Sequence, residues 1–164
     1  MYAFHNNRQK PVLDETDVKI LNILQQRADM SFTDIAAKVF RSHTNATNRI
    51  RKMQNSGIIK KIVAVLDRQL VGRPTLVVTM VKLNNHSAIT LRNFAAQMNL
   101  LDEVQFCLHL SGEYDFLLQV TLRDPQEYEE FLDSKLCALP VVEKVQSSFV
   151  LRECKTLAAL PLVV

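Results

Sequence analysis

The sequence predicts an α+β protein with an N-terminal helix-turn-helix domain of three helices and a C-terminal βαββαβ domain of the ferredoxin-like type. Apolar residues recur at helical spacing up to about residue 60, and from about residue 75 strand-like alternation takes turns with helical segments. We therefore expect a helix-turn-helix domain, a linker strand with a hinge, a βαββαβ domain and a C-terminal tail at residues 12–60, 61–74, 75–154 and 155–164.

Polar capping residues mark where the three N-terminal helices begin. Asp14, Ser31 and Ser42 each precede a segment with apolar residues at i, i+3 and i+4 spacing. Gly57 follows the third segment, at the position where a left-handed glycine commonly ends a helix. The expected helices run to about residues 26, 40 and 55.

Positive charge is concentrated in this part of the chain. Residues 1–61 contain 11 Lys or Arg against 5 Asp or Glu, whereas residues 62–164 contain 9 against 12. Residues 41–61 hold six Lys or Arg and no acidic residue. This asymmetry indicates that the N-terminal domain faces an anion such as nucleic acid, with chance clustering of charge as the alternative.

The third helix carries a polar face that suits the major groove of double-stranded DNA. Short polar side chains in its N-terminal half can approach base edges, and Arg or Lys further along can reach phosphates. A solvated helix would more readily use Glu, Lys and Gln than Thr, Asn and His. Arg49 has a structural alternative, in which it buttresses the helix. The expected DNA-binding residues are Ser42, His43, Thr44, Asn45, Thr47, Asn48, Arg49, Arg51 and Lys52.

The C-terminal domain should contain four strands, at residues 76–83, 103–111, 115–122 and about 143–152. Caps at Ser87 and at Asp124-Pro125 begin its two helices. The inward faces of the second and fourth strands should carry Val104, Phe106, Leu108 and Leu110, and Val145, Phe149 and Leu151. The sheet face away from the helices is too apolar for water, so we expect a second subunit to cover it. We expect the apolar tail to dock on a neighbouring subunit or on its own sheet.

Three motifs in order resemble those of the Lrp/AsnC family of amino-acid-responsive regulators, over about residues 12–160. The pattern L-D-x-x-D-x-x-I-L occurs at residues 13–21, and R-[IV]-x-x-[LM]-x-x-x-G-[IV]-I occurs at residues 49–59. The pattern S-G-x-x-D before an apolar strand occurs at residues 111–118.

The resemblance implies a DNA-binding transcriptional regulator of the prokaryotic cytoplasm, associated with the nucleoid. It implies homodimers that assemble into octamers, with residues 61–66 as a linker strand that pairs across the dimer. An amino-acid effector would bind between dimers near Ser111, Gly112, Glu113, Tyr114 and Asp115. The turn at Gly112 can present N–H groups to a carboxylate, and Glu113 or Asp115 can face an ammonium. A plain β-hairpin turn is the alternative for this loop.

The chain departs from the family pattern in four places. Phe40-Arg41-Ser42 stands where Gly-Leu-Ser is usual before the recognition helix. Ala46 replaces a larger apolar residue, Gln54 replaces Glu, and Val141 replaces a glycine. We expect Phe40 to fill the volume lost at Ala46.

Other functional classes find little support in the sequence. Cys107 and His109 share a strand, but no third ligand has a suitable spacing, so we expect no metal and no cofactor. No nucleophile or phosphate-loop motif indicates an enzyme, and no apolar run is long enough to span a membrane. The remaining alternative is an architectural DNA-binding protein that responds to no effector.

Overall fold

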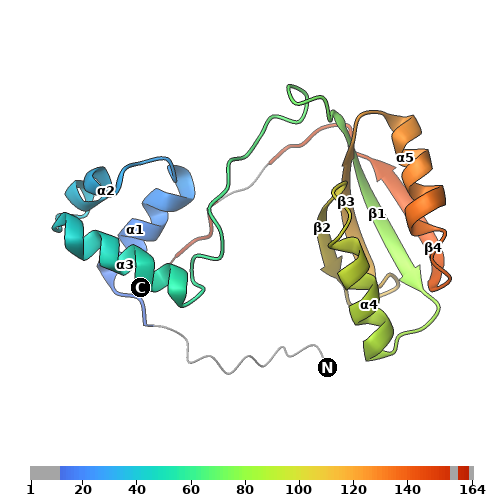
Figure 1. Ribbon diagram of the computed structural model, residues 1–164, viewed down its shortest axis with the longest axis horizontal. Helices are drawn as coiled ribbons and strands as arrows, with labels where there is room; N and C mark the ends of the chain where they lie inside the picture. Colours follow the sequence, from blue (N-terminus) through green and yellow to red (C-terminus); the bar gives the residue numbers. More distant parts are fainter. Residues whose placement is uncertain (1–11, 156–158, 163–164) are drawn as a thin grey trace. The chain divides into compact units, whose positions relative to one another are not determined.

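The computed structural model describes residues 12–155 and 159–162 (Figure 1). These residues form two compact units. The helical unit comprises residues 12–65 together with 155 and 159–162, and the sheet unit comprises residues 66–154. No helix in the described ranges is long and apolar enough to cross a membrane.

The helical unit contains α1 (Glu15–Gln26), α2 (Phe32–Lys38) and α3 (His43–Asn55). The predicted caps are confirmed. Asp14, Ser31 and Ser42 each accept a hydrogen bond from the backbone N–H three residues later, at 2.8, 3.1 and 3.3 Å. Gly57 follows α3 with a φ of 76°. The three helices enclose one apolar core, whose buried members are Ile20, Leu21, Leu24, Ile35, Val39, Ile50 and Met53.

The turn between α2 and α3 ends α2 without the usual glycine. Phe40 has a φ of 54°, in the left-handed region, and its N–H donates to the carbonyl of Ala37 while the N–H of Arg41 donates to that of Ala36. This pair of bonds is the Schellman arrangement, with Phe40 at the position that glycine prefers. The prediction that Phe40 fills the volume beside Ala46 is wrong, because the turn leaves Phe40 88% exposed.

The sheet unit has the predicted βαββαβ order (Figure 1). Its elements are β1 (Thr75–Leu83), α4 (Ala88–Met98), β2 (Val104–His109), β3 (Phe116–Leu122), α5 (Pro125–Phe131), a π-helical turn (Leu132–Leu136) and β4 (Val142–Phe149). The strands form an antiparallel sheet in the order β2-β3-β1-β4. Side chains of α4 and α5 pack on one sheet face and enclose the core of the unit.

Three residues that were expected to face inward in this sheet do not: Phe106, Leu108 and Leu151. The register of β2 shifts by one residue between Val104 and Phe106, so Val104 and Cys107 pack on the core while Phe106 and Leu108 are 45% and 49% exposed. A one-residue bulge reverses the faces of every residue beyond it, which accounts for the error. Leu151 is 99% exposed because β4 ends two residues earlier, at Phe149.

The sheet face away from the helices is apolar at its centre. Leu76, Val78 and Met80 alternate with the core residues of β1, and Leu117 lies opposite Met80 on β3. Leu108 pairs with Leu117 and extends this surface to β2. We call this surface the open sheet face.

The two segments outside these elements differ from expectation in different ways. Residues 61–66 form no strand within the described chain, and Ile62, Val63, Val65 and Leu66 are 46 to 73% exposed. The pairing of this segment across a dimer stays a prediction. The described part of the tail, residues 159–162, packs on the helical unit and not on its own sheet, and residues 156–158 and 163–164 lie outside the described residues.

Candidate nucleic-acid interface

The recognition helix α3 has one buried face and one exposed face. Ala46, Ile50 and Met53 are at most 2% exposed and pack toward the core of the helical unit. The predicted DNA-binding residues that the structure leaves exposed are Ser42, His43, Thr44, Asn45, Asn48, Arg51 and Lys52. A continuous polar and basic surface without a carboxylate therefore runs along α3.

Thr47 is an exception among the predicted contacts. It is 7% exposed, and within the described residues its Oγ1 has no hydrogen-bond partner. Its position, one residue after Ala46 and three before Ile50, places it at the margin of the buried face. Thr47 therefore does not belong to the exposed surface of α3.

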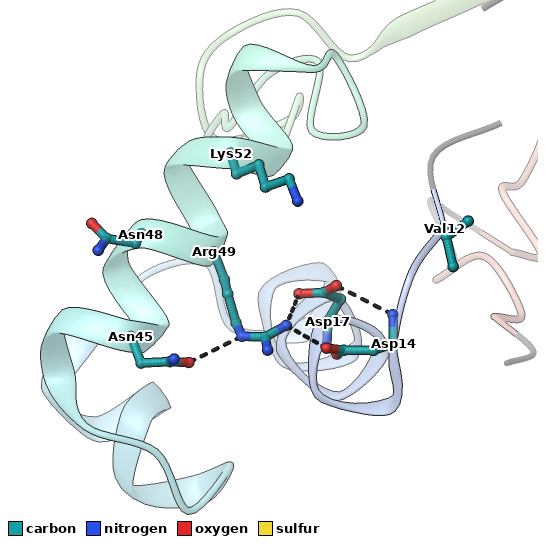
Figure 2. A pocket seen from close by; sticks show the side chains of 7 residues that line it. All are labelled: Val12, Asp14, Asp17, Asn45, Asn48, Arg49 and Lys52. Carbon is teal, nitrogen blue, oxygen red and sulfur yellow. Dashed lines mark hydrogen bonds and ion pairs between the residues drawn. The ribbon is translucent and has the colours of Figure 1, made fainter. Parts of the chain in front are cut away.

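Arg49 points from α3 toward the beginning of α1 (Figure 2). Its Nη1 lies 2.7 Å from Oδ2 of Asp14 and 2.8 Å from Oδ1 of Asp17, and its Nε donates to Oδ1 of Asn45 at 3.0 Å. The hydrogen bonds with Asp17 and Asp14 raise the pKa of Arg49. With its guanidinium held in this way, Arg49 fits the structural role that the sequence left open, and it fixes α3 against α1.

Asp14 is held in its charged form by two neighbours. The backbone N–H of Asp17 and then the guanidinium of Arg49 lower the pKa of Asp14 below its ordinary value of 3.8. The same carboxyl caps α1, because the side chains of Asp14 and Asp17 each accept a hydrogen bond from the backbone of the other. One cluster therefore both begins α1 and anchors α3.

A hollow of about 360 Å³ lies between the beginning of α1 and α3 (Figure 2). Asn48 points away from the ion pairs in this view, and Lys52 stands one turn along the helix from it. Arg49 balances one of the two carboxylate charges at this hollow, and Lys52 adds a second positive charge, so the polar and cationic side chains here can meet an anionic backbone. The residues that line the hollow are Val12, Asp14, Asp17, Asn45, Asn48, Arg49 and Lys52.

Arg41 is a second tie between α1 and the recognition helix. Its Nη2 donates to Oγ1 of Thr16 at 3.2 Å, and its Nη1 donates to the carbonyl of Phe40. Helical spacing and capping patterns do not indicate this role of Arg41, or the contacts of Asp14 and Asp17 with α3. A signal was present for Asp17, which is an acid at a position where the spacing of α1 calls for an apolar residue.

The predicted effector loop between β2 and β3 contains one buried and three exposed members. Ser111, Gly112 and Glu113 are exposed, and Gly112 has a φ of 137°, a backbone conformation that favours glycine. Asp115 is 9% exposed, and its Oδ2 accepts from the backbone N–H of Leu83 at 2.8 Å. Its Oδ1 lies 3.2 Å from Nε2 of His86, so structural contacts engage both oxygens.

An exposed ion pair lies beside this loop. Nζ of Lys144 is 3.1 Å from Oε1 of Glu113 and 5.2 Å from the centre of the Tyr114 ring. The Tyr114 hydroxyl donates to Oε1 of Gln146 at 2.6 Å. Tyr114, and then Glu113, raise the pKa of Lys144. One carboxylate and one ammonium are therefore presented together at the loop.

Cys107 and His109 do not share the surroundings that a metal site needs. Cys107 packs on the core, where burial raises the pKa of its thiol, and His109 lies against the ring of Phe116. Within the described ranges, no group of three or more His, Cys, Asp or Glu could hold a metal ion.

Two family models match the chain, one for each unit. Residues 76–160 match the Lrp/AsnC ligand binding domain, and residues 13–60 match a winged helix-turn-helix DNA-binding domain. Among curated relatives, the leucine-responsive regulatory protein of Haemophilus influenzae is 32% identical over 148 residues, which are 90% of this chain and 89% of the relative. The DNA-binding transcriptional activator DecR of Escherichia coli is 29% identical over 151 residues, covering 92% of this chain and 99% of the relative.

Solved structures agree with these matches. A transcriptional regulator from Neisseria meningitidis, solved as a complex with L-methionine, superposes with a TM-score of 0.84 at 30% identity, covering 92% of this chain and 97% of that one. An AsnC family transcriptional regulator from Agrobacterium tumefaciens superposes with a TM-score of 0.83 at 32% identity, covering 91% and 97%.

Proposed function

Because the chain belongs to the Lrp/AsnC family of transcriptional regulators, we propose that it binds double-stranded DNA through the exposed face of α3 and alters this binding when an amino acid binds its sheet unit. The surface of α3 is the observation that supports the proposed DNA binding. It is polar and basic, it bears no carboxylate, and it is anchored from behind by Arg49 and Arg41.

The chemistry of the side chains along α3 separates those that can contact bases from those that can contact phosphates. Asn45 and Asn48 carry amides that can donate to and accept from the edge of an adenine in the major groove. Arg51 and Lys52 supply positive charge for phosphates, which adds affinity without sequence preference. Arg49 acts behind them as a positioning residue.

A homodimer is the proposed cover for the open sheet face. Phe106 and Leu108 are about half exposed on it, and burying such side chains against a second copy removes apolar surface from water. Residues 61–66, which form no strand within the described chain, can add to the same interface. Further assembly of dimers into octamers, with the effector between dimers, is the arrangement that we propose from the family.

The proposed effector is an α-amino acid bound at the loop of residues 111–115. The Neisseria relative was solved with L-methionine, which has one carboxylate and one ammonium. In this chain the pair of Glu113 and Lys144 offers the two complementary charges, 3.1 Å apart and largely exposed. Glu113 is a better partner for an ammonium than Asp115, whose oxygens face Leu83 and His86.

Fluorescence anisotropy tests both parts of the proposal. The protein is titrated into labelled duplex from the region upstream of its own gene and into a duplex of random sequence, with and without a mixture of the twenty standard amino acids. We expect tighter binding to the upstream duplex and a change in affinity with the mixture. Equal binding to both duplexes and no response to the mixture would instead favour an architectural protein.

A further inference from the structure

Residues 159–162 of the C-terminal tail form part of the helical unit, although they follow the sheet unit in the chain. The side-chain amide of Gln25 on α1 bonds to the backbone of Leu160 on both sides. Its Oε1 accepts from the N–H of Leu160 at 2.6 Å, and its Nε2 donates to the carbonyl of Leu160 at 3.3 Å. The Gln25 amide therefore pairs with both the N–H and the carbonyl of Leu160, as the backbone of a neighbouring β-strand would.

An apolar contact fixes the same segment two residues later. Leu162 packs on the core of the helical unit, where Ile58 and Ile59, which follow α3 in the chain, are also packed. The red segment in Figure 1 that ends at these helices is this part of the tail. Residues 159–162 therefore touch α1 through hydrogen bonds and the core through a side chain.

The preceding stretch of chain is tied to the sheet unit. The N–H of Val150 donates to the carbonyl of Leu76, and Glu153 forms an ion pair with Arg68. Arg68 lies in the segment by which the chain first enters the sheet unit. The chain therefore passes between the two units twice, at residues 61–66 and after residue 153. The ion pair of Arg68 with Glu153 joins these two connections to each other at the sheet unit.

We propose that residues 159–162 act as a strap that keeps α1, and through α1 the recognition helix, in its DNA-binding arrangement. α1 is held at its end by Gln25 and at its beginning by the ion pairs of Asp14 and Asp17 with Arg49. Gln25 is thereby a positioning residue for α3, although it lies at the other end of α1 from Arg49. This inference rests on the DNA-binding part of the proposed function.

The test compares three full-length variants with the wild type. Gln25→Ala removes both hydrogen bonds, Gln25→Glu keeps the acceptor for the Leu160 N–H, and Gln26→Ala changes an exposed neighbour on the same helix as a control. Hydrogen–deuterium exchange reports on the tail and on α1, and anisotropy reports affinity for the upstream duplex at a temperature well below each unfolding midpoint.

We expect Gln25→Ala to speed exchange in the tail and in α1 and to weaken DNA binding about threefold to tenfold, the scale of one or two lost hydrogen bonds. Gln25→Glu should lie between it and the wild type, and Gln26→Ala should match the wild type. Unchanged exchange in Gln25→Ala would show that Gln25 does not hold the tail. Faster exchange with wild-type DNA affinity would show that the strap has no positioning role.

The same data separate this inference from the proposed function. If the wild type binds neither duplex, the DNA-binding proposal fails and the positioning role falls with it. The exchange data would still report whether the tail is docked on α1.

Discussion

Single residues around α3 divide into those that can meet DNA and those that hold the helix. Arg51 is exposed on α3, whereas Arg49, two residues earlier, is 27% exposed and paired with Asp14 and Asp17. The two arginines should therefore respond differently to substitution, even though they are neighbours on one basic helix.

Arg51→Gln should weaken DNA binding and reduce the dependence of log affinity on log salt concentration by about one, because one phosphate contact is lost. Anisotropy titrations at several salt concentrations measure this slope. Arg92→Gln, which removes the same charge from exposed α4, serves as the control. An unchanged slope in Arg51→Gln would remove Arg51 from the phosphate contacts.

The cluster of Asp14 and Arg49 should make the helical unit sensitive to acid. A carboxyl whose pKa is lowered on folding stabilises the native state above its unfolded pKa, and this contribution is lost as the pH falls through the folded value. The ordinary pKa of Asp14 is 3.8 and its folded value is lower. Stability should therefore fall below about pH 4. Asp14→Asn keeps a capping side chain and should flatten this part of the curve.

Thermal unfolding of the wild type and Asp14→Asn across acid pH measures the effect. Glu15→Gln, one residue away, is a comparison that leaves the contacts with Arg49 in place. Parallel pH curves for the wild type and Asp14→Asn would show that this carboxyl does not contribute.

Phe40 is a strained position at the entrance to α3. A non-glycine residue in the left-handed region costs about 1–2 kcal/mol, and glycine costs about 0.5–1 kcal/mol of additional chain entropy. Phe40→Gly should therefore stabilise the helical unit by up to about 1 kcal/mol in chemical denaturation. Phe40→Ala keeps the strained backbone and should give no gain, so equal stabilities of the two variants would contradict this explanation.

At the scale of elements, local chemistry was readable from the sequence and pairing between distant segments was not. Asp14, Ser31, Ser42, Ser87 and Asp124 all cap the helices that were expected of them, because a cap needs only a side chain and a backbone three residues away. The bulge in β2 depends instead on how that strand pairs with β3. No local pattern indicates such a shift.

The candidate DNA-binding site shows the same contrast between local patterns and contacts of distant segments. The amphipathic spacing of α3 predicts its exposed face, except that Thr47 is buried and Arg49 points to the beginning of α1. The carboxylate partners of Arg49 lie 32 and 35 residues away along the chain. Those contacts depend on how α1 packs on α3, and the hydrogen bonds of Gln25 with Leu160 join residues that are 135 apart in the chain, so spacing within one segment could not reveal either.

At the scale of the whole molecule, a second copy of the chain is the proposed cover for the open sheet face. Leu108→Lys places a charge on this face beside Leu117 and should convert a dimer to a monomer or raise its dissociation constant at least about tenfold. Sedimentation velocity measures the shift. Gln97→Lys, on the exposed side of α4, should leave the assembly unchanged. If both variants sediment like the wild type, the open sheet face is not the dimer interface.

Nuclease footprinting on the upstream DNA with the wild type and Asn48→Ala tests most directly whether the exposed face of α3 reads base sequence. Asn48 is exposed and points away from the ion pairs of Arg49, so its loss should leave the fold intact. We predict that Asn48→Ala loses specific protection, at a cost of about 1–3 kcal/mol for one base contact, while its affinity for random duplex stays at the wild-type level. An identical footprint at the same protein concentrations would contradict the claim.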